Sequence, residues 1–128
     1  MRKPILCLDC DGVCHTYTSG WQGEDVLPDP PVEGLFEFLR EVTSLFDVHV
    51  FSTRSKTERG RAAMQEWFQS HFQEWLSENE GASEFSLDLQ FPDSKPPAFV
   101  SLDDRALTFQ GEWPGLDTLT RFKPWFQK

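Results

Sequence analysis

The stretch ILCLDCDGV, residues 5–13, sets the expected fold of this 128-residue chain. Its first four residues are a continuous apolar run that ends at the carboxylate of Asp9. A run of this kind, without polar alternation, is typical of a strand buried on both faces, as strands are in parallel sheets. We therefore expect a central parallel strand at residues 5–8, with acidic groups at its carboxyl end.

Two longer segments have the periodicity of amphipathic helices. Apolar residues recur at helical spacing over residues 32–45 and again over residues 64–76. Ser55 and Glu58 suit a capping box that opens the second helix. A shorter helix is expected within residues 116–126.

Three further segments predict strands. Residues 48–51 and 98–102 are short apolar runs, and the run at 98–102 is typical of a buried strand. Residues 85–91 alternate between apolar and polar side chains, which is typical of an edge strand. Residues 14–31 are rich in Gly and Pro and predict an irregular loop. The order strand, helix, strand, helix, strand, strand predicts a single domain over residues 1–128, with three α/β layers and a mainly parallel sheet.

Polar side chains follow three of the predicted strands at the points where the strands end. They are Asp9 and Asp11 after the first strand, Ser52, Thr53 and Arg54 after the second, and Asp103 and Asp104 after the last. In open α/β sheets, ligands bind beyond the carboxyl ends of the strands. The sequence therefore predicts one polar site that is built from three separate segments.

The acids of this site suggest a division of labour. Asp9 and Asp11 are two residues apart, so their side chains point to the same side of an extended backbone. One carboxylate can attack phosphorus while the other transfers protons. Together with Asp103 and Asp104 they make an all-oxygen site, which suits magnesium rather than zinc. The alternative is two acidic turns, the second neutralised by Arg105.

Phosphate contacts are expected after the second strand and before the last. Ser52 offers a hydroxyl beside free backbone N–H groups, with Thr53 as the alternative if the register is shifted by one residue. Simple N-capping by Ser52 or Ser55 is the competing interpretation. Lys95 precedes the last strand and could offset the charge of a bound phosphoryl group, although it could equally be a surface lysine.

These segments together resemble the haloacid dehalogenase (HAD) superfamily over about residues 4–110. The four motifs of the family are met by Asp9, Asp11 and Val13 (D-x-D-x-[TV]), by Ser52, by Lys95, and by the pair Asp103 and Asp104. The resemblance implies a three-layer, Rossmann-like domain. One departure is the short distance from Lys95 to Asp103, since many members place a helix between them.

The resemblance also implies an activity. The chain would be a phosphatase, a phosphoric monoester hydrolase that works through an aspartyl-phosphate intermediate. Asp9 would be the nucleophile, and Asp11 would protonate the leaving group and then activate water. Ser52, or Thr53, and Lys95 would hold the phosphoryl oxygens.

The resemblance implies a Mg²⁺ ion as the cofactor. Its ligands would be Asp9, the backbone carbonyl of Asp11, and an acid of the last motif. Asp104 is the preferred direct ligand, with Asp103 either direct or in the outer shell. The rival interpretations are a phosphotransferase, a nucleic-acid end phosphatase, and a non-catalytic phosphate-binding module that keeps the HAD fold.

The spacing of the motifs leaves little room for a cap domain. Only about twenty residues separate Val13 from the first helix, and a folded domain normally needs at least about 50. A capless enzyme with an open mouth is expected, walled by residues 14–31. Two tryptophans in predicted loops, Trp21 and Trp113, are freer to meet substrate than those on the predicted helices. Its phosphorylated substrate could be large, and a partner subunit serving as a lid leaves a homo-oligomer open.

Composition narrows the partners and the location. The formal net charge of −9 disfavours long nucleic acid, because that affinity depends on Lys and Arg. No apolar run approaches the roughly 20 residues of a membrane span, and the apolar start is too short for a signal peptide. Cys7, Cys10 and Cys14 are too clustered for a disulfide framework, so we expect a cytoplasmic location. A metal–thiolate cluster is disfavoured because Cys7 lies within the apolar strand.

Overall fold

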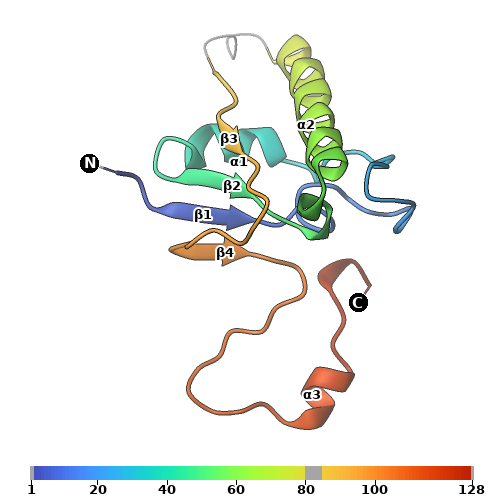
Figure 1. The fold of residues 1–128 in the computed structure, drawn as a ribbon, viewed down its shortest axis with the longest axis vertical. Helices are drawn as coiled ribbons and strands as arrows, with labels where there is room; N and C mark the ends of the chain where they lie inside the picture. Colours follow the sequence, from blue (N-terminus) through green and yellow to red (C-terminus); the bar gives the residue numbers. More distant parts are fainter. Residues whose placement is uncertain (1, 80–84, 128) are drawn as a thin grey trace.

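The computed structural model describes residues 2–79 and 85–127. Its elements are β1 (Ile5–Leu8), α1 (Leu35–Val42), β2 (Asp47–Val50), the 3-10 helix η1 (Thr53–Lys56), α2 (Glu58–Glu78), β3 (Leu89–Gln90), β4 (Val100–Leu102), α3 (Leu116–Thr120) and the 3-10 helix η2 (Trp125–Gln127). The four strands form one sheet in the order β3-β2-β1-β4, and every neighbouring pair is parallel (Figure 1). The predicted α/β class and parallel sheet are confirmed. None of the described helices is long and apolar enough to cross a membrane.

Both long helices pack on the same face of the sheet. The chain moves from β1 to β2 to β3 in one direction, and right-handed crossovers then place α1 and α2 on one side. Leu6 and Leu8 of β1 lie beside Val48 and Val50 of β2 and face these helices. The core on that side also contains Leu35, Phe36, Leu39, Val42, Met64, Trp67, Phe68 and Phe72.

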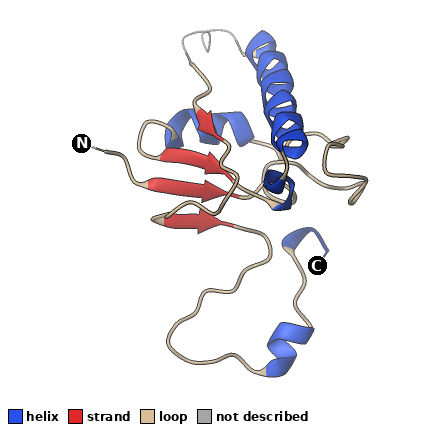
Figure 2. Ribbon diagram, in the orientation of Figure 1, coloured by secondary structure: helices blue, strands red, loops and turns tan. Residues whose placement is uncertain are grey.

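The opposite face of the sheet is covered differently. The connection from β3 to β4 has only nine residues, 91–99, whereas a helical crossover usually needs a dozen or more. It crosses the sheet without forming a helix (Figure 2). The third layer therefore stays a prediction.

The edge strand β4 is less buried than expected. Val100 and Leu102 are 44% and 43% exposed, so the sequence prediction of a buried strand at 98–102 is wrong. An apolar run favours burial only if another layer covers it, and β4 lies at the sheet edge. The predicted strand at 85–91 is an edge strand as expected, although the strand itself is restricted to Leu89–Gln90.

The turn after β2 is built differently from the prediction. The Ser52 side chain accepts a hydrogen bond from the Arg54 N–H (3.1 Å), and the Ser55 hydroxyl accepts one from the Ser52 N–H (3.0 Å). This capping box opens η1, and Thr57 then caps α2. The predicted box of Ser55 and Glu58 is therefore wrong, because the chain makes a separate 3-10 turn before the helix begins.

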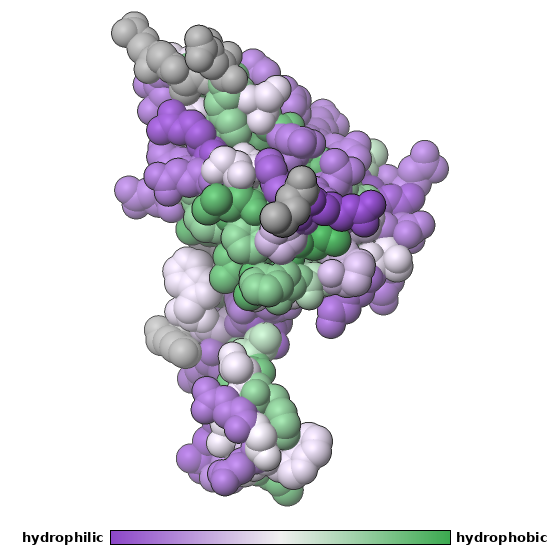
Figure 3. Space-filling model, turned by 90° about the vertical axis from the view of Figure 1, so that its left-hand side faces the viewer, coloured by the Kyte–Doolittle hydropathy of each residue, from purple (hydrophilic) through white to green (hydrophobic). Residues whose placement is uncertain are grey.

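The segment after β4 leaves the body of the molecule and returns to it (Figure 1). Hydrophobic patches lie on the narrow lower part of the molecule in Figure 3. The large apolar side chains exposed on this segment are Leu107, Phe109, Trp113, Leu116 and Leu119. The helix expected over 116–126 is limited to α3 and η2. The residue before a proline disfavours helical geometry, and Pro124 lies between the two elements.

Candidate functional site

Three carboxylates meet at the carboxyl ends of β1 and β4. The Asp9 N–H donates to the Leu102 carbonyl (3.0 Å), which extends the parallel pairing of the two strands by one residue. Asp103 and Asp104 follow directly and are brought beside Asp9. One carboxylate oxygen from each of the three lies within 4.8 Å of the others. Acids more than ninety residues apart in the sequence thus form one cluster, as the strand ends predicted.

The cluster is electrostatically unfavourable without a cation. Burial, a hydrogen bond with Asp104 and the charge of Asp103 raise the pKa of Asp9 to about 8. The Asp104 side chain is only 2% exposed, and its Oδ1 atom has no hydrogen-bond partner among residues 2–79 and 85–127. A buried polar atom without a partner is costly. The all-oxygen donor set fits a hard cation, which would neutralise the charges and satisfy this atom.

Asp11 lies in a different environment from the cluster. Its carboxylate accepts hydrogen bonds from Arg54 Nε (3.0 Å and 3.2 Å to the two oxygens) and lies 2.9 Å from His15 Nδ1. Burial alone would raise the pKa of Asp11, but the hydrogen bonds from His15 and Arg54 lower it overall. The Asp11 side chain is therefore an ionised carboxylate turned toward Arg54, and it is not one of the three clustered acids.

His15 is a buried link between Asp11 and the loop of residues 14–31. Its Nε2 atom accepts a hydrogen bond from the Asp29 N–H (3.0 Å). Because Nε2 is an acceptor, Nδ1 carries the proton and donates a hydrogen bond to the Asp11 carboxylate. The His15 side chain is fully buried.

Arg54 was predicted only as part of the polar cluster after the second strand, and its pairing with Asp11 is the main feature that sequence reasoning missed. Its side chain is completely buried, and its Nη1 atom donates to the carbonyls of Gly23 (2.8 Å) and Glu24 (2.9 Å). The Trp21 ring covers the guanidinium, with its centroid 4.7 Å from Cζ. Arg54 therefore fastens the loop to the end of β2. The signal available in the sequence was an arginine just after one strand, next to a strand that ends in two acids.

The backbone around Arg54 is tightly packed as well. Gly60, in the first turn of α2, has no space for a side chain, because a Cβ there would overlap the Arg54 carbonyl. The first turn of α2 can therefore rest directly against η1. This close approach helps to hold Arg54 in place.

The predicted phosphate contacts are brought near the site to different degrees. The N-capping interpretation of Ser52 is confirmed, and its hydroxyl also lies 3.5 Å from the Met64 sulfur. Thr53 is exposed at the start of η1. Lys95 is exposed, and within the described ranges it forms no ion pair with the acid cluster. Phosphate binding by these three residues stays a prediction.

Gly12 joins the site to the end of the chain. It has a φ of +83°, and a Cβ at this position would overlap both the Asp104 carboxylate and the Phe126 ring. Its carbonyl accepts a hydrogen bond from Trp125 Nε1 (2.7 Å). The turn after Asp11 therefore requires glycine, and the C-terminal segment closes against it.

The cysteines serve packing. Cys10 and Cys14 are fully buried, and this burial raises the pKa of both thiols well above its ordinary value. The Cys14 thiol donates to the Asp9 carbonyl at 3.3 Å. A buried, protonated thiol is a poor metal ligand and a poor nucleophile.

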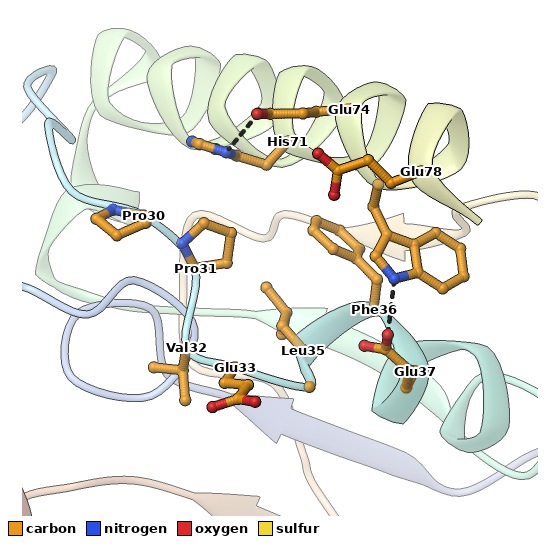
Figure 4. Close-up of a pocket in the computed structure, with 12 residues that line it drawn as sticks. Pro30, Pro31, Val32, Glu33, Leu35, Phe36, Glu37, His71, Glu74 and Glu78 are labelled. Carbon is orange, nitrogen blue, oxygen red and sulfur yellow. Dashed lines mark hydrogen bonds and ion pairs between the residues drawn. The ribbon is translucent and has the colours of Figure 1, made fainter.

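A pocket of about 340 Å³ lies between α1 and α2 (Figure 4). Its rim is acidic and contains Glu33, Glu37, Glu74 and Glu78. It shares no residue with the three-carboxylate cluster.

The chain matches no family model, and its comparison with curated proteins and with solved structures gave no match.

Proposed function

We propose that this chain is a magnesium-dependent phosphohydrolase of the HAD type, which cleaves a phosphate monoester through an aspartyl-phosphate on Asp9. The observation that carries the proposal is the meeting of Asp9, Asp103 and Asp104 at the ends of adjacent parallel strands. Asp11 lies two residues from the nucleophile in a separate, ion-paired environment. The finer fold assignment, a three-layer HAD-like domain without a cap, belongs to the same proposal.

Asp9, Asp104, Asp103 and the backbone carbonyl of Asp11 would hold the Mg²⁺ ion. The unpartnered Oδ1 atom of Asp104 supports this assignment, because it is a buried acceptor without a donor among the described residues. When bound, the cation would offset the repulsion among the acids and favour the ionised form of Asp9.

Asp9 and Asp11 divide the chemistry between them. A carboxylate oxygen of Asp9 attacks phosphorus, and the bond from phosphorus to the leaving oxygen breaks. Asp11 gives its proton to that leaving oxygen, then takes a proton from the water that cleaves the aspartyl-phosphate. In the free protein Asp11 is ionised, and an incoming phosphate dianion beside it would raise its pKa and let it carry the proton.

Two neighbouring groups support these steps. Arg54 and His15 fix the Asp11 carboxylate from two sides, so its position does not depend on substrate. The Ser52 hydroxyl accepts from the Arg54 N–H and donates to the Met64 sulfur at 3.5 Å, so it would have to give up this weak sulfur contact to donate to a phosphoryl oxygen. Lys95 would need to approach the cluster to contribute its charge.

The test is hydrolysis of an aryl phosphate with and without magnesium. Wild-type protein should show magnesium-dependent turnover, and Asp9→Asn should abolish it, because an amide does not attack phosphorus. Asp88→Asn, which changes an exposed acid beside β3, is the matched control and should keep the wild-type rate. Turnover by Asp9→Asn at the wild-type rate would rule the mechanism out.

A non-catalytic phosphate-binding module is the second candidate. The lowered pKa of Asp11 favours it, since an ionised carboxylate cannot protonate a leaving group. Such a module would bind inorganic phosphate with magnesium, as calorimetry would show, but would not turn over any monoester. A phosphoryl adduct on Asp9, detected by mass spectrometry in the Asp11→Asn variant, would exclude it.

A further inference from the structure

Trp21 occupies a defined position beside the proposed site. Its ring covers the guanidinium of the buried Arg54, yet the residue is 52% exposed. Since one face of the indole lies on Arg54, the exposed area belongs to the opposite face and the rim. A single exposed aromatic residue is ordinary on a protein surface, so its exposure alone does not indicate a binding site. The indication comes from the residues around Trp21.

The loop around Trp21 is fixed on both sides. On one side, Ser19 donates its N–H (2.8 Å) and its hydroxyl (2.6 Å) to the Asp29 carboxylate. On the other side, the Gly23 and Glu24 carbonyls accept hydrogen bonds from Arg54. A planar side chain held in this way is ordered before any ligand arrives, which reduces the entropy lost on binding.

The same guanidinium connects Trp21 to the chemistry. Arg54 binds the Asp11 carboxylate through Nε, while its planar face lies against Trp21. Asp11 is the proposed proton donor to the leaving oxygen, so the leaving group must start within hydrogen-bond distance of Asp11. Trp21 is linked to Asp11 through a single residue, Arg54, which makes its exposed ring a candidate contact for the body of the leaving group.

Arg54 keeps one further group unused. Its Nη2 atom is buried and has no hydrogen-bond partner in the part of the chain that the structure describes. A cation behind one face of an indole and a planar ligand on the other form a stack that is favoured electrostatically.

We infer that Trp21 is a stacking surface for a planar, aromatic leaving group, so that the preferred substrates are base-bearing phosphate monoesters such as nucleoside monophosphates. This inference rests on the proposed function, because it places the leaving group by means of Asp11. The net charge of −9 favours a short substrate over a long polyanion.

The test compares two monoesters that differ only in the base. Adenosine 5′-monophosphate and ribose 5-phosphate carry the same ester on the same sugar, and the readout is the ratio of their kcat/KM values with magnesium present. Stacking of a base on an aromatic side chain corresponds to about a tenfold effect or more. The wild-type ratio should therefore be about ten or above, and Trp21→Ala should bring it close to one.

Three variants sharpen the test. Trp21→Phe should keep most of the ratio, because it keeps an aromatic plane. Trp21→Leu should lose it as Trp21→Ala does, because it keeps only apolar bulk. Trp113→Ala removes the most exposed tryptophan, at 87%, on the segment after β4, and should leave the ratio and both rates unchanged.

The outcomes separate the inference from the proposed function. Turnover of both substrates with a ratio near one, or a ratio that Trp21→Ala does not change, would overturn the stacking surface and leave the phosphohydrolase intact. If the wild-type protein hydrolyses neither substrate, the proposed function fails and the stacking surface fails with it.

Discussion

The two acids after β1 lie in the middle of the sheet, whereas the two acids after β4 lie at its edge. Around Asp9 and Asp11 the turn is closed by hydrogen bonds from Arg54, His15 and Trp125. Around Asp104 the preceding strand is exposed, and a buried carboxylate oxygen has no partner among the described residues. Side-chain hydrogen bonds therefore hold the half of the site that follows β1. The half that follows β4, called the edge half below, is positioned by the pairing of β4 with β1.

The comparison also shows which of the four acids should depend on a cation. Asp11 already has two donors that offset its charge, so it needs no further ligand. Asp9, Asp103 and Asp104 have each other as neighbours, and burial, a hydrogen bond with Asp104 and the charge of Asp103 together raise the pKa of Asp9. Four predictions test the contrast.

The largest effect on stability should come from Arg54, and the exposed Arg105 is the comparison for it. Arg54→Met leaves the buried Asp11 carboxylate without its main partner, and loss of one member of a buried ion pair costs about 3–5 kcal/mol of unfolding free energy. Arg105→Met removes a 56% exposed side chain 3.9 Å from Asp104 and should cost no more than about 1 kcal/mol. Urea unfolding measures both.

A conservative variant refines this comparison. Arg54→Lys keeps the charge but cannot reach Asp11, Gly23 and Glu24 at once, so it should fall between wild type and Arg54→Met. Equal losses for Arg54→Met and Arg105→Met would show that the two halves are not held differently.

Magnesium should stabilise the protein through the edge half of the site. At a hundred times its dissociation constant, the cation adds about 2.7 kcal/mol to the unfolding free energy. Asp104→Asn should raise the stability of the metal-free protein, since it removes a repelling charge, and should also remove most of the magnesium gain. Asp11→Asn should keep the gain, because its side chain faces Arg54. Thermal unfolding with magnesium or with chelator measures this, and a full gain in Asp104→Asn would contradict the site.

The two carboxyls after β1 should respond to pH with opposite signs in the metal-free protein. The pKa of Asp9 is raised from 3.8 to about 8, so the native state holds a proton that the unfolded state lacks between these values. Stability should fall as the pH rises through this window, by at most about 1.4 kcal/mol per pH unit for one proton. The pKa of Asp11 is lowered, so its contribution is present above its ordinary value and is lost on acidification.

Other groups titrate in the same window, so the measurement is a difference. Urea unfolding in chelator at several pH values between 5 and 8 is compared for wild type and Asp9→Asn. The wild type should lose stability relative to the variant as the pH rises. If the stability difference between wild type and Asp9→Asn stays constant, or grows in favour of the wild type, the pKa of Asp9 is not raised in the acid cluster.

The meeting of the acids could be predicted from the sequence, because the ends of strands are encoded locally. An apolar run that stops at a carboxylate fixes where β1 ends, and parallel pairing then aligns that end with the end of β4. The same reasoning did not find the pairing of Arg54 with Asp11, since the two are 43 residues apart and follow different strands. Which side chain crosses between strands depends on rotamers and on the path of the loop.

Burial and capping were harder to predict for physical reasons. The composition of β4 is that of a buried strand, but burial depends on a covering layer that local sequence does not encode. Ser52 and Ser55 are both good capping residues, and the separate turn of η1 decides which one acts. The burial of His15 is not encoded locally, because it depends on Asp29, fourteen residues away.

The smallest effect should come from the C-terminal segment, which touches both halves of the site. Trp125→Phe removes the hydrogen bond to the Gly12 carbonyl and should cost about 0.5–1.5 kcal/mol of unfolding free energy. Trp113→Phe is the matched control on the exposed part of the segment after β4 and should cost nothing measurable. Phe126 lies against the same glycine, next to Asp104, so the loss in Trp125→Phe should be smaller when magnesium already holds Asp104 in place. Urea unfolding of both variants, with magnesium and with chelator, measures this coupling. An equal loss under both conditions would mean that the segment stabilises the β1 turn alone and takes no part in the edge half of the site.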